Sequence, residues 1–571
     1  MRRRNGSSRN STRSSHGTSD DRIRRLAVIT AIPSDESYEL TVPESPLDLG
    51  FDSIPSWWPL QRQTIGRVVS AFNSGYDVVM LNAPPGSGKT LVAAASSKLL
   101  GTKSVTFTHT LALQDQYLRT ATWAETMKGK SNYECGEQQR SDAAFVRSSL
   151  RREVLTTEDC DEYLDCENPW RNGCPYYAAL GQAADSNLVV LNYSYGLRIA
   201  QSPYLKRGVC LDEDDSPLPN PFLREMAVSD EGHLANDAIV GACALEFWHK
   251  TLRKMGLRCP TNNDPVEWQQ WAQSLVLTSN YANMDIVTQA RMRNHQERLS
   301  QLRTINPADW IVQPSDNMTK LQPIWARSVY SNFLGKYLKL LIMSATLGNP
   351  DLLQAKLGLD DKSVAYVDVG STFPVQNRPV FYWPTVKLNA KSEDSDYATL
   401  ASAIQFIANQ PNLATKKGIV HTSSYKVARR LAPYLRQDSR YLIQESSETR
   451  EALVALFSEE GNNFVIVTPS LSTGFDLPYL IGFQIIAKVP FSDLGDPLVK
   501  ARREYELPDD NKFGKKTYDD DAQNQVIQAC GRAVRAPDDM GVSYILDANW
   551  WGLYKRSYSP EYFRESVQWL N

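Results

Sequence analysis

Short apolar runs alternate with amphipathic segments along most of the chain, starting at about residue 60. A short apolar run bounded by turn-forming residues is typical of a buried strand, whereas apolar residues three to four positions apart indicate a helix. Strands are predicted at Val78–Leu81, Ser104–Thr108, Met226–Ser229, Leu340–Met343, Gly418–His421, Phe464–Thr468, Gln484–Val489 and Ser543–Leu546. Because helix-like stretches separate most of them, the pattern predicts βα units around parallel sheets, an α/β fold.

This alternation is interrupted between residues 243 and 335. Asp264, Pro265 and Glu267 form the pattern of a helix start: an N-cap, a proline at the first helical position and an acidic residue in the first turn. Aromatic and apolar residues follow at helical spacing. We therefore predict a mainly helical insertion over 243–335.

The N-terminal residues are Arg, Ser, Asn and Gly with almost no apolar content. Such a segment cannot bury enough apolar surface to fold, so we expect a disordered basic tail over 1–40. A solvated tail is favoured over a phosphate-contacting arm or a transit peptide.

Composition narrows the class of protein. A chain of 571 residues is too long for one core, and about two to four domains are expected. The net charge of −3 gives no overall attraction for nucleic acid, so any such surface must be a local groove. No apolar run is long enough for a membrane span or a secretory signal. We therefore expect no membrane association and an intracellular protein, cytoplasmic in a bacterium or an infected host, or nuclear in a eukaryote.

A predicted strand, a glycine-rich loop and a predicted helix follow one another over residues 78–100. The glycines let backbone N–H groups approach phosphate oxygens, and the helix N-terminus adds a favourable dipole. Lys89 would reach the β- and γ-phosphates, and Thr90 would ligate Mg²⁺. The pattern predicts a P-loop for ATP formed by Ala83, Pro84, Pro85, Gly86, Ser87, Gly88, Lys89 and Thr90.

A second predicted strand ends in the adjacent carboxylates Asp230 and Glu231, followed by Gly232 and His233. Downstream of a P-loop this pair predicts a Walker B site, in which Asp230 holds the Mg²⁺ shell and Glu231 activates the attacking water. In isolation an Asp-Glu pair is more often solvated surface. Gly232 replaces the usual alanine, a small-for-small change that we expect to leave the chemistry unaffected.

Gln528, Arg532 and Arg535 lie near the C-terminus within Gln-Ala-Cys-Gly-Arg-Ala-Val-Arg. On a helix, the two arginines would present one cationic face. Arginines that enter a γ-phosphate site from a second domain stabilise transition-state charge, although the same spacing alone is commonly a solvated helix face. The glutamine and glycine at fixed offsets favour the catalytic interpretation of all three residues.

In this order the motifs resemble superfamily 2 helicases, and more narrowly the XPD/DinG group. Further matches are Trp58-Pro59-Leu60-Gln61 (adenine recognition), 108–116 (motif Ia), Ser344-Ala345-Thr346-Leu347 (motif III), 421–424 (motif IV), 468–476 (motif V), Lys488-Val489-Pro490-Phe491, Asp496-Pro497 and Ser371-Thr372-Phe373-Pro374. The resemblance covers about residues 57–548. It implies two RecA-like domains that bind ATP between them, with Gln61, Gly474 and Asp476 among the nucleotide-binding residues.

Four of the eight cysteines, Cys135, Cys160, Cys166 and Cys174, lie within forty positions. In a reducing compartment such a group indicates a metal site before disulfides, and four thiolates suit a [4Fe–4S] cluster or a structural zinc. The intervals lack the paired Cys-x₂₋₄-Cys knuckles typical of zinc. The XPD/DinG group carries a four-cysteine [4Fe–4S] domain at this position. A cluster is therefore expected, with Zn²⁺ as the alternative.

Motifs and patterns together predict the order of domains. The basic tail is followed by a first RecA-like domain, which holds the cysteine insertion and a helical insertion like the group's Arch domain. The predicted boundaries are 1–40 (tail), 41–130, 179–242 and 336–375 (first RecA-like domain, its last part containing motif III and the linker), 131–178 (iron–sulfur insertion), 243–335 (Arch-like insertion) and 376–571 (second RecA-like domain).

The resemblance implies an ATP-dependent DNA helicase that tracks single-stranded or forked DNA with 5′→3′ polarity. We expect a compact monomeric member from a bacterium or a phage. Candidate contacts to the strand are Thr108, Thr110, Gln114, Thr422 and Thr468, since hydroxyls and amides bind phosphates without sequence preference. The alternative is a switch or recruitment platform that binds ATP and nucleic acid without unwinding. Lys89 and Glu231 argue against it, because a pure binder needs no water-activating carboxylate.

Overall fold

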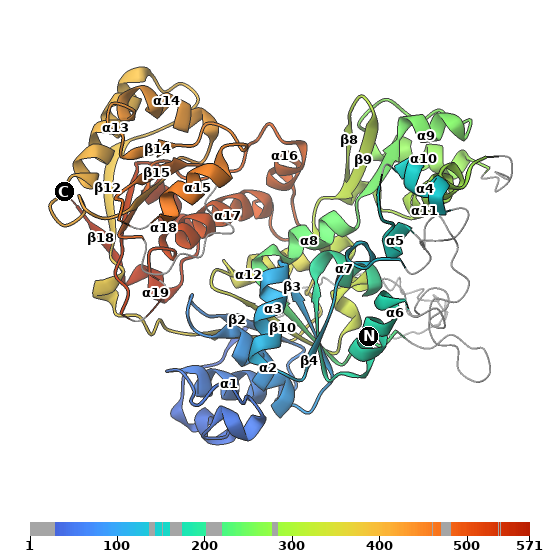
Figure 1. The fold of residues 1–571 in the computed structure, drawn as a ribbon, viewed down its shortest axis with the longest axis horizontal. Helices are drawn as coiled ribbons and strands as arrows, with labels where there is room; N and C mark the ends of the chain where they lie inside the picture. The colour runs from blue at the N-terminus through green and yellow to red at the C-terminus, as the bar shows by residue number, and fades with distance from the viewer. Residues whose placement is uncertain are drawn as a thin grey trace, which may run out of the picture.

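The structure is a computed structural model that describes residues 29–135, 143–150, 152–159, 174–200, 220–276, 284–459, 461–469, 481–534, 536 and 538–570. Figure 1 shows two sheet-containing bodies and a smaller lobe that holds α9, α10 and α11. The chain builds the first sheet, leaves it to form the lobe, returns to complete the sheet and then forms the second sheet.

The first body contains an eight-stranded sheet in the order β1-β11-β2-β10-β6-β3-β5-β4, and every neighbouring pair is parallel. The central strands are buried along their whole length, which explains their continuous apolar sequences. The strands are β1 (Thr30–Ala31), β2 (Val78–Asn82), β3 (Ser104–Thr108), β4 (Ala124–Met127), β5 (Leu188–Asn192), β6 (Met226–Asp230), β10 (Lys339–Ser344) and β11 (Val364–Asp368).

Helices cover both faces of this sheet. Alternate residues of β2 belong to two different core clusters, Val78 and Met80 to one and Val79 and Leu81 to the other, as expected for a strand buried on both faces. The helices are α1 (Gln61–Asn73), α2 (Lys89–Leu99), α3 (Leu111–Thr120), α6 (Pro175–Asp185), α7 (Tyr193–Ala200), α8 (Ala235–Ala242) and α12 (Pro350–Leu357).

The lobe combines helices with a small antiparallel sheet in the order β7-β9-β8. Its core includes Phe247 and Trp268, both fully buried. The elements are β7 (Leu245–Trp248), α9 (His249–Lys254), α10 (Pro265–Ser274), α11 (Ile286–Leu302), β8 (Trp310–Pro314) and β9 (Met318–Pro323). Two helices from the cysteine segment, α4 (Ala143–Leu150) and α5 (Thr157–Asp159), lie near this lobe in Figure 1.

The second body contains a seven-stranded parallel sheet in the order β14-β15-β13-β16-β17-β12-β18. Its strands are β12 (Val380–Val386), β13 (Gly418–His421), β14 (Tyr441–Ile443), β15 (Val465–Thr468), β16 (Phe483–Ile486), β17 (Val542–Asp547) and β18 (Val567–Trp569). Its helices are α13 (Asp394–Ala408), α14 (Tyr425–Leu435), α15 (Arg450–Ser458), α16 (Pro497–Glu504), α17 (Phe513–Cys530), α18 (Trp550–Arg556) and α19 (Glu561–Arg564).

The second body contacts the base of the lobe through α16 and the start of α17. Phe513 packs in one apolar cluster with Ile324 and Trp325, which lie just after β9. The same cluster contains Leu352 of α12 in the first body. The three parts of the molecule therefore meet in one place.

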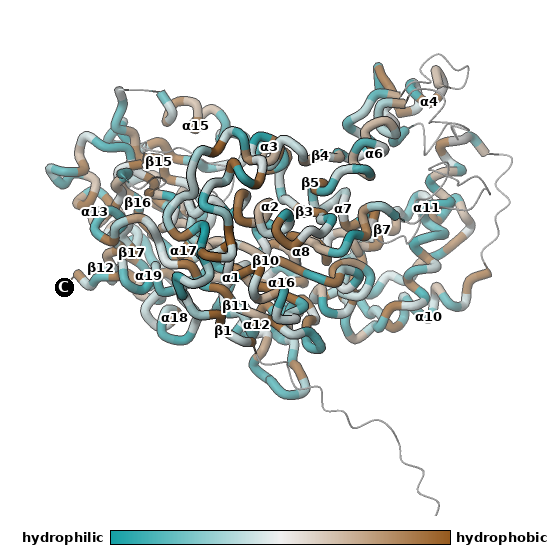
Figure 2. The backbone as a smooth tube through the Cα atoms, turned by 90° about the horizontal axis from the view of Figure 1, so that it is seen from below, coloured by the Kyte–Doolittle hydropathy of each residue, from teal (hydrophilic) through white to brown (hydrophobic). Residues whose placement is uncertain are grey.

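The eight predicted strands are all present as β2, β3, β6, β10, β13, β15, β16 and β17, so the α/β prediction with two parallel sheets is confirmed. Asp264 caps α10, where its side chain accepts the Val266 N–H, as predicted. Figure 2 shows hydrophobic residues in short stretches along the tube. In the described part of the chain, none of the helices is apolar and long enough to span a membrane.

Two features differ from the predictions. The expected tail over 1–40 includes ordered residues, because β1 pairs with β11 and a 3-10 helix follows at Glu36–Thr41. The insertion over 243–335 contains the expected helices, but also the β7-β9-β8 sheet. Its strands are short and mix apolar with polar and partly exposed residues, so they lack the continuous apolar runs of the parallel sheets.

Candidate functional site: a nucleotide site between two RecA-like domains

The P-loop connects β2 to α2 at the carboxyl edge of the first sheet. Gly86 and Gly88 have φ angles of 76° and 69°, a left-handed conformation that glycine adopts without strain. The Lys89 ammonium donates to the Ala83 carbonyl across the loop at 3.2 Å. The loop therefore has the backbone shape of a phosphate-binding nest, with a cation at its centre.

Gln61, the predicted adenine-recognition residue, forms a hydrogen bond with the backbone of this loop. Its Nε2 donates to the Ser87 carbonyl at 3.2 Å, and its Oε1 accepts the Trp58 N–H at 2.8 Å. A Cβ on Gly88 would lie 1.9 Å from Gln61 Nε2 and would displace that amide, and the positive φ of Gly88 also favours glycine. The Trp58 side chain beside it is half exposed, and adenine recognition by this pair stays a prediction.

The Walker B carboxylates end β6, two strands away from the P-loop strand. Asp230 is 3% exposed, and burial together with the neighbouring Glu231 raises its pKa to about 7. Burial raises the pKa of Glu231, but the charges of Lys89, His233 and Arg532 and the hydrogen bond from Ser344 together outweigh it, and the pKa is lowered. Glu231 is thus held as a carboxylate, whereas Asp230 has a proton that a metal ion would displace.

Gly232 is required by packing, a constraint separate from the chemistry of the site. A Cβ at this position would lie 2.3 Å from Ile342 Cγ2 on the adjacent strand β10. Glu231 itself has a φ of 49°, so the turn directly after β6 is tight. This constraint could not be predicted from the sequence, because Ile342 is more than a hundred residues away.

A chain of hydrogen bonds links the second body to Glu231. Gln528 of α17 donates from Nε2 to His233 Nε2 at 2.8 Å. Because burial lowers the pKa of His233, the imidazole is neutral, and its Nδ1 then donates to Ser344 Oγ at 2.8 Å. The Ser344 hydroxyl donates in turn to Glu231 Oε2 at 3.2 Å. Gln528 also donates to Thr346 Oγ1 at 2.7 Å, which completes a second link to motif III.

Gln528 therefore lies at the contact between the two bodies, and its predicted catalytic role stays a prediction. His233, Ser344 and Thr346 were not among the predicted site residues, although the motifs that contain them were recognised. The motifs that contain these three residues were the sequence signal that could have indicated them. What sequence could not show is that their side chains join into one network with Glu231.

Arg532 lies beyond α17, which ends at Cys530, so the predicted helical face shared by Arg532 and Arg535 is wrong for Arg532. The positive charge of Arg532 still reaches Glu231 and contributes to its lowered pKa, after Lys89. Arg535 lies outside the described residues, as do Gly474 and Asp476. Their predicted roles stay predictions.

Two of the four predicted cluster ligands can be located. Cys135 is nearly buried, and its N–H donates to the Leu155 carbonyl at 2.9 Å. Cys174 is also nearly buried, at the start of α6. Cys160 and Cys166 lie outside the described residues. Within the part of the chain that the structure describes, no three His, Cys, Asp or Glu side chains are grouped closely enough to hold a metal ion.

The predicted strand contacts divide into two kinds. Thr110 is exposed at the start of α3, where its hydroxyl caps the helix by accepting the Leu113 N–H. The other four side chains are fully buried and bonded internally, for example Thr468 Oγ1 to Gln444 Oε1 at 2.6 Å. This corrects the prediction of direct side-chain contacts for Thr108, Gln114, Thr422 and Thr468.

The fold and the site define a two-domain P-loop protein, with the nucleotide loop in the first domain and Gln528 and Arg532 contributed by the second. Residues 407–566 match the family model of a helicase C-terminal domain. The structure resembles that of an XPD helicase, with a TM-score of 0.56 and 17% identity over 90% of this chain and all of that one. It is also similar to Xpd4 of S. tokodaii, with a TM-score of 0.54 and 15% identity over 90% of this chain and 100% of that one.

Two bacterial relatives are similar in sequence. The ATP-dependent DNA helicase DinG of Photobacterium profundum is 27% identical over 197 residues, 32% of this chain and 27% of the relative. The ATP-dependent DNA helicase YoaA of Haemophilus influenzae is 30% identical over 162 residues, 27% of this chain and 24% of the relative. The matches span about a quarter of the length of these relatives. Together these findings show that the chain resembles XPD helicases in fold, and the DinG and YoaA helicases in sequence over part of its length.

Proposed function

We propose that the protein is an ATP-dependent helicase or translocase that moves along single-stranded DNA and hydrolyses ATP between its two RecA-like domains. One observation carries the proposal: the hydrogen-bond chain from Gln528 through His233 and Ser344 to Glu231. It connects the second domain to the carboxylate that would activate water. A movement of the second domain would therefore alter the position of that carboxylate.

Each residue of the nucleotide site has a role that follows from its placement. The P-loop N–H groups and Lys89 would hold the β- and γ-phosphates. Thr90 and Asp230 would complete the shell of a Mg²⁺ ion, which neutralises phosphate charge when bound. The residues fit this ion, because a buried carboxylate with a raised pKa gains a charge partner when the metal replaces its proton. Glu231, held as an anion, would accept the proton of the attacking water.

The second domain would act on the developing negative charge. Arg532 lies just beyond α17 and near enough to Glu231 to lower its pKa. In the proposed reaction it would stabilise the γ-phosphoryl oxygens, with Arg535 as a second candidate. Closure of the two domains on ATP and their opening after hydrolysis would move the strand, with the exposed Thr110 among its contacts.

The main alternative is a switch that binds ATP and nucleic acid without unwinding. The two functions differ in one assay: ATP hydrolysis with and without single-stranded DNA, alongside unwinding of duplexes that carry a 5′ or a 3′ tail. We expect DNA-stimulated hydrolysis and unwinding of the 5′-tailed duplex. Nucleotide binding without hydrolysis would favour the switch, and unwinding only from 3′ tails would overturn the polarity.

The variant Glu231→Gln tests the assigned chemistry. It should retain ATP binding and lose ATP turnover by about a hundredfold or more, the contribution expected of a general base. Glu225→Gln is the matched control, since Glu225 is exposed just before the same strand. Equal activities of Glu231→Gln and the unmodified protein would contradict the role of Glu231.

We further propose that Cys135, Cys160, Cys166 and Cys174 hold a [4Fe–4S] cluster, which would stabilise the insertion in the first domain. The burial of Cys135 and Cys174 supports it. Cys135 is disulfide-bonded in this structure, so cluster binding requires reduction of that bond to thiolates. Anaerobically purified protein should contain about four irons per chain and absorb broadly near ~400 nm. One zinc per chain without visible absorption would replace the cluster by a structural zinc site.

A further inference from the structure

Ala345, the middle residue of motif III, is held by a tyrosine from the far C-terminal end of the described chain. The hydroxyl of Tyr562 donates to the Ala345 carbonyl at 2.8 Å. The residues on either side of Ala345 are those already described: Ser344 reaches Glu231, and Thr346 accepts a hydrogen bond from Gln528. Three consecutive residues of motif III thus have three separate partners, two of them in the second domain.

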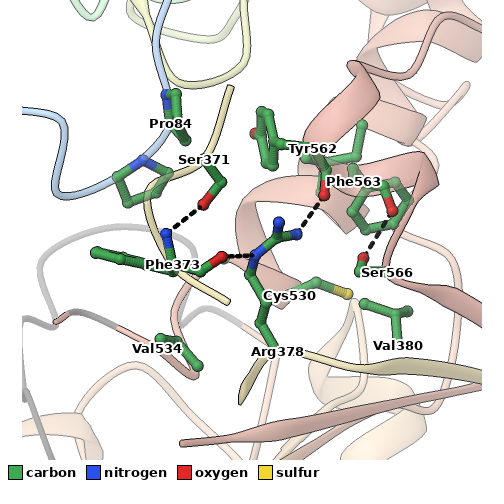
Figure 3. A pocket seen from close by; sticks show the side chains of 13 residues that line it. Pro84, Ser371, Phe373, Arg378, Val380, Cys530, Val534, Tyr562, Phe563 and Ser566 are labelled. Carbon is green, nitrogen blue, oxygen red and sulfur yellow. Dashed lines mark hydrogen bonds between the residues drawn. The ribbon is translucent and has the colours of Figure 1, made fainter. Parts of the chain in front are cut away.

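Arg378 holds the backbone of Tyr562 in place. The Arg378 guanidinium donates to the Tyr562 carbonyl and to the Glu565 carboxylate, both in the segment around α19. Its Nε donates to the Phe373 carbonyl at 3.1 Å. Figure 3 shows the bonds from Arg378 to Tyr562 and to Phe373, around a small apolar pocket whose lining includes Cys530 and Phe563. Arg378 therefore joins α19 to the segment between β11 and β12, which connects the two domains.

Phe373, which is bonded to Arg378, also contacts the P-loop. The Phe373 ring packs with Ala533 and Val534, which follow Arg532 in sequence. A Cβ on Gly86 of the P-loop would lie 2.3 Å from Phe373 Cζ, so ring and loop are in close contact. Phe373 thus contacts both the phosphate loop and the segment after α17. Arg378 links Phe373 to Tyr562, which contacts motif III.

We propose that Tyr562 is a positioning residue of the ATPase site. By holding the Ala345 carbonyl, it sets the position of Ser344 and Thr346, and through them that of Glu231. The inference deepens the proposed ATPase function and rests on it. The motif strings did not indicate this residue, because it lies after the last of them.

The Tyr562 hydroxyl keeps its proton and can donate this hydrogen bond across the neutral pH range. Burial raises the pKa of Tyr562, so the phenol stays protonated near neutral pH. Tyr562→Phe removes one oxygen and leaves the packed ring in place. Tyr558→Phe is a matched control, because the Tyr558 hydroxyl also makes a 2.8 Å hydrogen bond to the first domain, but to Tyr366 on β11.

The experiment compares the two variants with the unmodified protein in DNA-stimulated ATP hydrolysis and in base pairs unwound per ATP. We expect Tyr562→Phe to lower the maximal rate about fivefold or more, since a buried carbonyl loses its donor at the reacting site. The KM for ATP and the thermal midpoint should match those of Tyr558→Phe. Equal rates of the two variants, in an active protein, would overturn the proposal.

A second measurement separates this proposal from the proposed function. Hydrogen exchange of the amides at residues 344–347 should accelerate in Tyr562→Phe and not in Tyr558→Phe, whether or not the protein hydrolyses ATP. An unmodified protein without ATPase activity would end the proposed function alone. Unchanged exchange in Tyr562→Phe would overturn the positioning role, whatever the activity.

Discussion

Replacing Arg502 by alanine removes the side chain that joins the second domain to both parts of the first. Arg502 lies on α16, and its Nε donates to the Ile324 carbonyl at 2.9 Å. A second nitrogen pairs with Asp237 of α8 at 2.7 Å. The guanidinium also lies 4.9 Å from the centre of the Trp325 ring. The three partners belong to the base of the lobe and to the helix that follows the Walker B turn.

The magnitude follows from these contacts. A charged donor to a carbonyl contributes about 1.5–3 kcal/mol. The ion pair adds about 0–1 kcal/mol, because the Asp237 side chain is 62% exposed and therefore well screened. The cation–π contact adds about 0.5–1 kcal/mol. Since one guanidinium makes all three contacts, they are not additive, and we expect Arg502→Ala to weaken the interface by about 3 kcal/mol.

A chain with two domains need not unfold as one unit, so a weaker interface should separate the unfolding of the domains. Urea unfolding followed by tryptophan fluorescence would detect this, because Trp325 lies at the interface. Arg503→Ala is the control: Arg503 is exposed on the same helix, and its guanidinium lies 5.7 Å from the Tyr518 ring. Unfolding curves for Arg502→Ala and Arg503→Ala that agree within about 0.5 kcal/mol would refute the reasoning.

Two further predictions concern the Walker B turn. Gly232→Ala should destabilise the first domain by about 1–3 kcal/mol through overpacking against Ile342. Gly241→Ala on α8, where an added Cβ meets no atom within 4 Å, should be neutral or stabilising, and urea midpoints would compare them. Mg²⁺ affinity should rise about tenfold from pH 6 to pH 8, because the Asp230 pKa of about 7 means that the metal competes with a proton below that pH. A metal titration of nucleotide-bound protein measures this, and a pH-independent affinity would show that Asp230 is ionised throughout.

The sign of the Asp230 effect on stability is also fixed. An acid whose pKa is raised on folding binds its proton more tightly in the folded state. Its contribution to stability is present at low pH and is lost as pH rises from its unfolded value toward about 7. Without metal, raising the pH through this range should therefore lower the free energy of unfolding, and bound Mg²⁺ should oppose that loss.

The buried parallel strands could be predicted because their sequences carry the signal directly. Val78–Leu81 is apolar throughout and Met226–Ser229 apart from Ser229, since both faces of the sheet are covered. The three strands of the lobe could not, because their apolar residues alternate with polar and partly exposed ones and give no continuous run. The helix α10 of the same lobe could be predicted, since the Asp264 cap is a local pattern.

In the site as well, the features encoded by neighbouring residues could be predicted, and those that depend on residues distant in sequence could not. The P-loop and the Asp230–Glu231 pair are local strings on predicted strands. The need for Gly232, the contact between Gln528 and His233, and the link from Tyr562 to Ala345 depend on residues that are distant in sequence. Burial was misjudged for the same reason: a threonine at a strand end, such as Thr468, can face solvent or the core.

The first strand of the chain has a practical consequence for truncation. β1 covers the β11 edge of the first sheet, and the buried Arg67 fastens it by donating to the carbonyls of Ile32 and Asp368. A protein shortened to begin at residue 41 would lose this cover. The β11 edge would then present unpaired N–H and C=O groups, which are a template for strand pairing between molecules. A protein that begins at residue 29 keeps the edge covered and should be the more soluble of the two.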